Sequence, residues 1–153
     1  MSIDTHPASD RRTARQRSGD AAEAAAARFL VSQGLPALQR HFVRRVGEID
    51  LIHIEPASGT VVFVEVRYRR SSAYGGALGS VGVRKRRALQ RVVRAWLQAH
   101  ADRRRPARID VIGMTCSSPS TALELTWAEP SWRSWEDYRL CWIENALTDQ
   151  LAT

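Results

Sequence analysis

Residues 47–69, GEIDLIHIEPASGTVVFVEVRYR, predict two apolar β-strands, at 48–55 and 61–69, joined by a short loop of Pro, Ser and Gly. Such strands are typical of a hairpin that buries at least one face in a core. Each strand nevertheless contains a carboxylate, Asp50 in the first and Glu65 in the second. A carboxylate that faces a core needs a compensating partner, so these two residues decide how the hairpin is interpreted.

The register of this hairpin follows from its loop. With the loop centred between Ala57 and Ser58, the facing pairs are Ile54 with Val61, Ile52 with Phe63, Asp50 with Glu65 and Glu48 with Arg67. This register matches apolar residues with each other and places one acid opposite another. Facing side chains have Cβ atoms ~4.5–5.5 Å apart, a separation at which like charges destabilise a sheet.

Two arrangements would stabilise the facing acids: a divalent cation bound by both, or a proton shared between them, which raises one pKa. In the first, Asp50, Glu65 and a main-chain carbonyl such as that of Val66 form an oxygen site suited to Mg²⁺ or Mn²⁺. In a plainer alternative, Asp50 pairs with an arginine and Glu65 with Arg67 at a solvated edge. These alternatives remain open at this point.

The rest of the chain predicts helices and strands in alternation. We expect a disordered basic tail at 1–17 and a single domain at 18–153. The patterns within that domain predict a helix that starts at Ser18 or Asp20 and ends at Gly34, a strand at 37–45 and, after the hairpin, a glycine-rich loop at 71–82. Beyond the loop they predict a helix at 83–100, a strand at 107–116, a weaker strand at 121–127 and a helical turn near 142–149. This order predicts an α/β fold, in which helices flank a mixed sheet with a central antiparallel hairpin.

The charge of the chain favours a polyanionic partner. Its 153 residues include 23 Lys and Arg against 16 Asp and Glu, for a net charge of +7. Cys116 and Cys141 match no metal or redox spacing, so we expect unpaired, small hydrophobic residues. With no long apolar run and no signal peptide, we expect a cytoplasmic protein that does not enter membranes.

Arginines recur on the expected helix at 83–100, on a different face from its apolar residues. We predict that nucleic acid, most simply DNA, binds along these arginines and those beside the hairpin: Arg44, Arg45, Arg69, Arg70, Arg84, Arg87, Arg91 and Arg94. The alternative is an ordinary solvated helix face. Lys85, the only lysine, lies instead on the apolar face, from which it could reach the acids or extend into solvent.

These residues resemble a known family. G-E-I-D-L-I followed by F-V-E-V-R-Y-R, together with Gly19, Asp20 and Glu23, is similar to the YraN family of bacterial proteins, and the resemblance spans 18–147. That family is placed among the PD-(D/E)XK nucleases, near the archaeal Holliday-junction resolvases, which implies a restriction-endonuclease-like core. The resemblance makes Asp50 and Glu65 the metal-binding acids.

The resemblance also implies roles for three further residues. Arg67 stands at the position of the nuclease lysine, Lys85 lies in the matching helix entry, and Glu23 corresponds to an extra acid of the resolvases. Arginine keeps the positive charge of that lysine but does not release a proton in proteins. Glu23 has a second interpretation, as the third residue of a capping box that begins at Asp20.

Other polar residues have plainer interpretations. His41 and His53 could in principle bind a metal, but His53 lies on the strand face opposite Asp50, so we expect a packed or surface histidine. Asp110 follows Arg108 with strand alternation, which predicts a structural ion pair.

Three functions remain. The first is a metal-dependent endonuclease-like protein that acts on DNA, with branched and single-stranded DNA among the candidate substrates. The second is a nuclease-fold protein that binds nucleic acid without cutting it. The third is a structural or assembly factor with a basic surface. A homodimer would help so small a domain span two strands.

Overall fold

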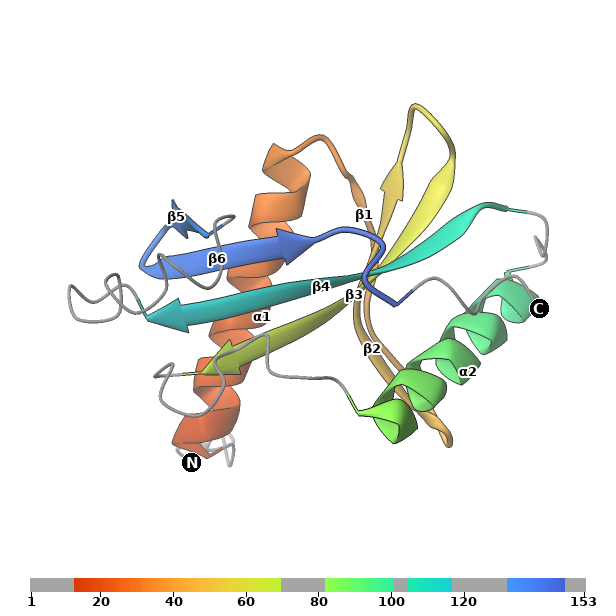
Figure 1. The fold of residues 1–153 in the computed structure, drawn as a ribbon, viewed down its shortest axis with the longest axis horizontal. Helices are drawn as coiled ribbons and strands as arrows, with labels where there is room; N and C mark the ends of the chain where they lie inside the picture. Colours follow the sequence, from red (N-terminus) through yellow and green to blue (C-terminus); the bar gives the residue numbers. More distant parts are fainter. Residues whose placement is uncertain (1–12, 70–81, 101–104, 117–131, 148–153) are drawn as a thin grey trace, which may run out of the picture.

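The computed structural model describes residues 13–69, 82–100, 105–116 and 132–147. Two helices, α1 (Ala14–Ser32) and α2 (Val83–Ala99), accompany strands β1 (Ala37–Arg44), β2 (Gly47–Glu55), β3 (Thr60–Arg69), β4 (Ala107–Cys116), β5 (Arg133–Trp135) and β6 (Tyr138–Ile143). The strands form a six-stranded sheet in the order β1-β2-β3-β4-β6-β5 (Figure 1). Only β3 and β4 are parallel, and the other neighbours are antiparallel, so the sheet is mixed.

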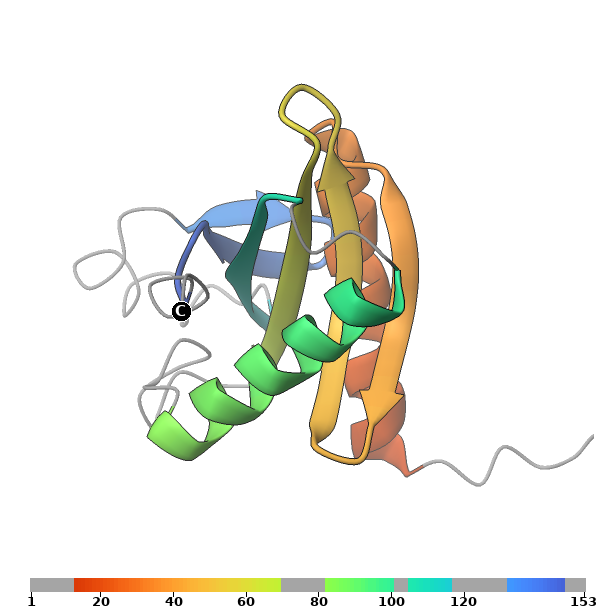
Figure 2. The same cartoon turned by 90° about the vertical axis from the view of Figure 1, so that its right-hand side faces the viewer.

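The sheet lies between the helices, with α1 on one face and α2 on the other (Figure 2). On the first face the small side chains of α1 allow close packing, and Phe29 and Leu30 meet Leu51, Val64 and Ile112. On the second face Leu89, Val93 and Trp96 of α2 pack over residues of β1 to β4. This three-layer α/β arrangement confirms the predicted restriction-endonuclease-like core, with its central antiparallel hairpin flanked by helices.

The predicted hairpin register is confirmed for its apolar pairs, whereas the predicted pairs Asp50–Glu65 and Glu48–Arg67 lie beyond the end of the β2–β3 ladder. Ile52 pairs with Phe63 and Ile54 with Val61. Ile52, Val61 and Phe63 are fully buried in the core beneath α2, as expected for apolar residues on one strand face. The strands predicted at 37–45 and 107–116 and the helix at 83–100 also match β1, β4 and α2.

Helix α1 starts earlier than predicted. It begins at Ala14 rather than after Ser18 or Asp20, because Thr13 and Gln16 form a capping box, in which each side chain binds the backbone N–H of the other. Residues 14–17 are therefore helical, although the predicted tail included them; the remainder of that tail, 1–12, lies outside the described residues.

The predicted helical turn near 142–149 is wrong where the structure describes it. Trp142 and Ile143 belong to β6, which pairs with β4, and residues 144–147 form turns. Pairing with a buried strand outweighed the local pattern. The loop at 71–82, apart from Gly82, and the weak strand at 121–127 lie outside the described residues.

In the part of the chain that the structure describes, neither helix is long and apolar enough to cross a bilayer.

Candidate functional site

The candidate site lies where β2 and β3 separate. Their ladder extends from Glu55 and Thr60 to Leu51 and Val64, and beyond that point the two strands diverge in both ribbon views (Figures 1 and 2). A cavity of about 1030 Å³ opens there. Residues of α1, β2, β3 and the start of α2 line it: Ala14, Arg15, Gln16, Ser18, Gly19, Asp20, Glu23, Asp50, Glu65, Val66, Arg67, Tyr68, Arg69, Gly82 and Lys85.

The hairpin acids meet at this cavity, and their charges are only partly compensated. Asp50 Oδ2 accepts a hydrogen bond from the Val66 amide at 2.8 Å. Glu65 Oε1 lies 3.3 Å from Lys85 Nζ. Glu65 Oε2 is buried, and no hydrogen-bond donor in the described part of the chain reaches it. A proton shared with Asp50 or a bound cation would satisfy this oxygen.

Burial raises the pKa values of both acids. Burial raises the pKa of Glu65 to about 8, and the charge of Asp50 adds to the rise, whereas Lys85 lowers it. Burial also raises the pKa of Asp50, against the hydrogen bonds from Val66 and Glu65. At neutral pH, without a cation, the pair therefore holds a proton between its carboxyl groups.

The donor set fits a hard divalent cation that keeps part of its hydration. In a strand, the N–H and C=O of one residue point the same way, so the Val66 carbonyl faces the gap in which its amide meets Asp50. No group of three or more His, Cys, Asp and Glu side chains that could hold a metal occurs among the described residues. Two carboxylates, a carbonyl and water match the preferences of Mg²⁺ better than those of a metal that requires an all-protein cage.

Basic residues border the acids. Lys85, predicted either to reach the acids or to extend into solvent, reaches Glu65 from the first turn of α2 with 47% of its side chain exposed. Arg67 is half-buried and Arg69 is exposed, and both line the cavity. An ammonium thus lies beside Glu65, although the strand itself supplies Arg67 at the position where the resemblance implies a lysine.

Glu23 also lies at the cavity, with 7% of its surface exposed. Its interpretation as part of a capping box is wrong, because the helix is capped by Thr13 two turns earlier. Its Oε1 lies 2.7 Å from His41 Nε2 and 3.5 Å from Arg40 Nη2. Burial raises the pKa of Glu23 to about 7, and the charge of Asp50 adds to this. Sequence reasoning missed this role of His41, since strand patterning does not predict its backbone conformation.

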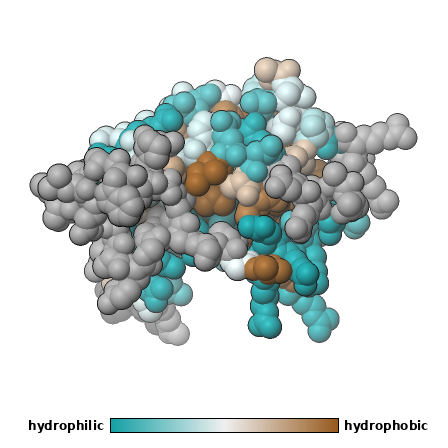
Figure 3. Space-filling view, in the orientation of Figure 1, coloured by the Kyte–Doolittle hydropathy of each residue, from teal (hydrophilic) through white to brown (hydrophobic). Residues whose placement is uncertain are grey.

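The predicted nucleic-acid arginines lie on two neighbouring surfaces. Arg84, Arg87, Arg91 and Arg94 are exposed along α2, and hydrophilic atoms project where that helix begins (Figure 3). Arg44 and Arg45 are exposed at the β1–β2 turn. The backbone of this turn lies close to α2, since a Cβ atom added to Gly47 would come within 3.3 Å of the Val92 side chain. Arg70 lies outside the described residues.

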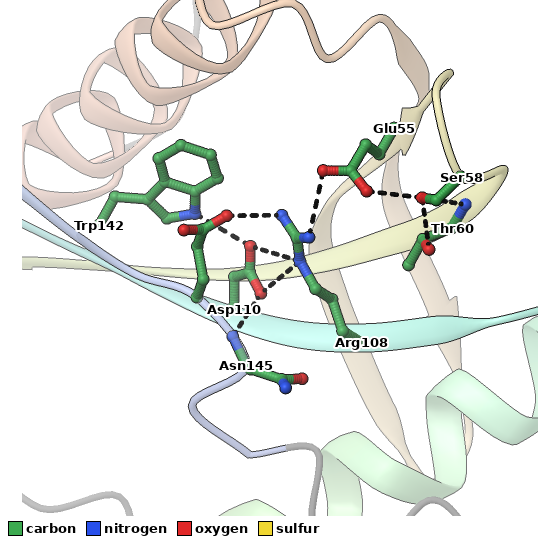
Figure 4. A network of polar contacts seen from close by, with 8 residues as sticks. Glu55, Ser58, Thr60, Arg108, Asp110, Trp142 and Asn145 are labelled. Carbon is green, nitrogen blue, oxygen red and sulfur yellow. Dashed lines mark hydrogen bonds and ion pairs between the residues drawn. The ribbon is translucent and has the colours of Figure 1, made fainter.

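The other polar predictions concern structure. Arg108 Nε contacts Asp110 Oδ1 at 3.1 Å, which confirms the predicted ion pair (Figure 4). His53 is fully buried, and its Nδ1 lies 2.9 Å from the Leu35 carbonyl oxygen, so it is the packed histidine expected. Cys116 and Cys141 are not joined to each other in a disulfide; Cys141 is buried, and half-buried Cys116 contacts the Tyr68 hydroxyl at 3.0 Å.

Comparison with known proteins places the chain in a family. Residues 22–114 match the model of the uncharacterised protein family UPF0102. A UPF0102 protein of Stutzerimonas stutzeri (strain A1501) is 44% identical over 120 residues, which cover 78% of this chain and 97% of the relative. A second from Pseudomonas syringae pv. syringae (strain B728a) is 41% identical over 124 residues, 80% of this chain and 98% of the relative. The chain therefore belongs to the UPF0102 family, which is the YraN family of the resemblance.

Proposed function

We propose that this protein is a metal-dependent phosphodiester hydrolase that acts on DNA as an endonuclease. The observation that carries the proposal is the unsatisfied Glu65 Oε2, opposite Asp50, in a cavity that also holds cationic side chains. With no donor from the described residues, this oxygen is balanced either by a proton shared with Asp50 or by a bound cation, and the cavity beside it gives a cation access. A site that merely stabilised the fold would gain by replacing one acid with an apolar residue.

Asp50, Glu65 and the Val66 carbonyl would hold Mg²⁺ or Mn²⁺. Such an ion supplies Lewis-acid polarisation of a phosphoryl oxygen and a water of lowered pKa. The protein residues then have separate tasks: Arg67 and Arg69 hold phosphate oxygens, Lys85 orients Glu65 and offers an ammonium to the phosphate, and Glu23 borders the site as a proton acceptor. Glu23 suits that task, since its pKa of about 7 is near neutral pH.

The exposed arginines of α2 and of the β1–β2 turn would bind the strand beyond the cavity. Contacts of this kind follow the phosphate backbone and carry no sequence information. The protein would therefore recognise DNA by shape, and branched and single-stranded DNA remain the candidate substrates. A homodimer would let two such sites act on two strands.

A second candidate is a protein that binds nucleic acid without cutting it. The observation that favours it is Arg67 at the lysine position, since a guanidinium does not exchange protons and is a poor substitute for an ammonium. Lys85, 3.3 Å from Glu65, weakens this objection by supplying an ammonium from another element.

Calorimetric titration of Mn²⁺ and Mg²⁺ into wild type, Asp50→Ala and Glu65→Ala tests the metal site. The same samples are then incubated with labelled single-stranded, duplex and four-way-junction DNA. Glu136→Gln serves as the matched control, because it removes a carboxylate that pairs with Arg28 away from the cavity. We expect metal binding and cleavage in wild type and control, and neither in the other two variants.

Two outcomes would overturn the proposal in different ways. DNA binding by wild type without cleavage in either metal would establish the binding protein. Cleavage that persists in Asp50→Ala would indicate a contaminating nuclease or a different site.

A further inference from the structure

His41 has an unusual backbone conformation for a residue in a strand. Its φ is 54°, in the left-handed region, although Arg40 and Phe42 on either side pair with Leu51 and Ile49 of β2. The ladder therefore places position 41 opposite Asp50. Residues other than glycine adopt this conformation rarely, and they cluster at sites where the strain serves a function.

The conformation changes where the side chains of β1 point. Successive residues of a regular strand point to opposite faces. Here Arg40 and His41 both contact Glu23 of α1, and Phe42 packs into the core beneath α2. The irregularity redirects His41 toward α1, much as a bulge re-aims a side chain beside an active site.

The result is a short contact to one defined oxygen. His41 Nε2 lies 2.7 Å from Glu23 Oε1, whereas Arg40 reaches the same oxygen only at 3.5 Å. Asp20 of α1 and Asp50 of β2 repel the Glu23 carboxylate, and Arg40 attracts it. The imidazole is thus the nearest basic group of those that face Glu23, and 48% of it remains exposed.

We propose that His41 is a positioning residue, whose strained backbone is retained because its Nε2–H fixes the Glu23 carboxylate at the cavity. This inference rests on the proposed function, in which Glu23 serves the reaction. In this role His41 acts through Glu23, which its Nε2 contacts, rather than on the substrate.

The first test needs no substrate or metal. Nitrogen-15 NMR of the His41 ring reports its tautomer, and carbon-13 relaxation of the Glu23 side chain reports its mobility. We expect a ring protonated on Nε2 in wild type and a mixture of tautomers in Glu23→Gln. The Glu23 side chain should become mobile in His41→Ala but stay rigid in His41→Gln, whose amide can donate from a similar position.

The second test separates positioning from a purely structural role. His41→Gly accepts the left-handed conformation without strain, so its thermal midpoint should equal or exceed that of wild type. Its kcat for DNA cleavage should nevertheless fall on the order of tenfold, as in His41→Ala, with KM unchanged and partial recovery in His41→Gln. His100→Gln is the matched control, because it alters an exposed histidine away from the cavity.

The outcomes are distinct. If wild type does not cleave DNA, the proposed function fails, and the NMR measurements alone decide whether His41 positions Glu23. An unchanged tautomer in Glu23→Gln together with an unchanged Glu23 mobility in His41→Ala would overturn the inference. A His41→Gly protein that loses stability and keeps full kcat would show that the residue is structural.

Discussion

Two carboxylate clusters in the same sheet differ in how completely their oxygens are bound. Asp110 of β4 is fully buried and accepts hydrogen bonds from Arg108, the Trp142 indole and the Asn145 amide, at 2.8–3.3 Å (Figure 4). Glu65 of the adjacent strand has Lys85 at one oxygen and no donor from the described residues at the other. The two positions are one step apart in register, since Val64 pairs with Asp110 and Glu65 with Val111.

The comparison contrasts an acid whose oxygens are all bound with an acid pair that keeps an oxygen without a donor from the described residues. Burial raises the pKa of both, so burial alone does not distinguish them. The donors around Asp110 come from β4, β6 and the turn after it, and they leave no oxygen for a ligand. The Asp50–Glu65 pair keeps acceptor capacity and opens into a cavity. Unused acceptors at an accessible point are what a metal site requires.

The largest effect should follow from removing Asp110, whose two oxygens are both bound by donors. Asp110→Ala removes the acceptor of the Arg108 Nε–H, the Trp142 indole and the Asn145 amide, so we expect a loss of about 3–5 kcal/mol in the free energy of unfolding. Urea denaturation measures it. Glu144→Ala removes an exposed partner of the same arginine and should cost less than about 1 kcal/mol. Equal losses in the two variants would contradict the contrast between the clusters.

Binding of Mn²⁺ at the Asp50–Glu65 pair should stabilise the folded protein. At a Mn²⁺ concentration of ~100 times Kd, binding to the folded state adds ~2.7 kcal/mol to the free energy of unfolding. We expect this gain in wild type and in Glu136→Gln, and its absence in Glu65→Ala, by urea denaturation with and without the ion. The same gain in Glu65→Ala would place the ion elsewhere.

Removing the charge of Glu65 should also stabilise the metal-free protein. The pKa of Glu65 is raised from 4.5 to about 8, so between these values the folded state binds more protons than the unfolded state. Stability is therefore highest below this window and falls as pH rises through it, by up to ~1.4 kcal/mol per pH unit. Glu65→Gln cannot ionise and should be more stable than wild type by about 2 kcal/mol near pH 8.

The measurement is urea denaturation of both proteins in chelator, at about pH 5 and about pH 8. Burial lowers the pKa of His53, which makes stability rise with pH, but this contribution is common to both proteins and cancels in the difference. A Glu65→Gln protein that is less stable than wild type at the higher pH would show that the acid is satisfied in the fold.

The smallest effect concerns the first turn of α1, which lines the cavity beside the Asp50–Glu65 pair. Thr13→Ala removes the cap that extends α1 to Arg15 and Gln16 at the cavity, and should cost about 1 kcal/mol. Ser18→Ala removes only a hydroxyl that donates to the Ala14 carbonyl within the helix, so we expect a smaller cost. The reverse order in thermal denaturation would place the start of the helix at Ser18, as the sequence pattern predicts.

Much of the hairpin was predictable from local rules. Strand alternation and loop length predict its register, because a one-residue slip would turn the apolar residues away from the core. The same rules predict that Asp50 faces Glu65, and helical periodicity predicts that Lys85 lies apart from the arginines. The start of α1 and the strand β6 were not predicted, since a Thr13–Gln16 cap and pairing with β4 compete with the local patterns.

The sequence by itself determined the hairpin, the facing acids, the basic helix and the family. Only the tertiary structure decided which distant residues complete each cluster. Lys85 of α2 contacts Glu65, and His41 of β1 contacts Glu23 of α1. Two of the three donors to Asp110 lie more than 30 positions further along the chain. Such contacts depend on how helices and strands pack, and a left-handed residue within a strand is stabilised by that packing rather than by its own sequence preference.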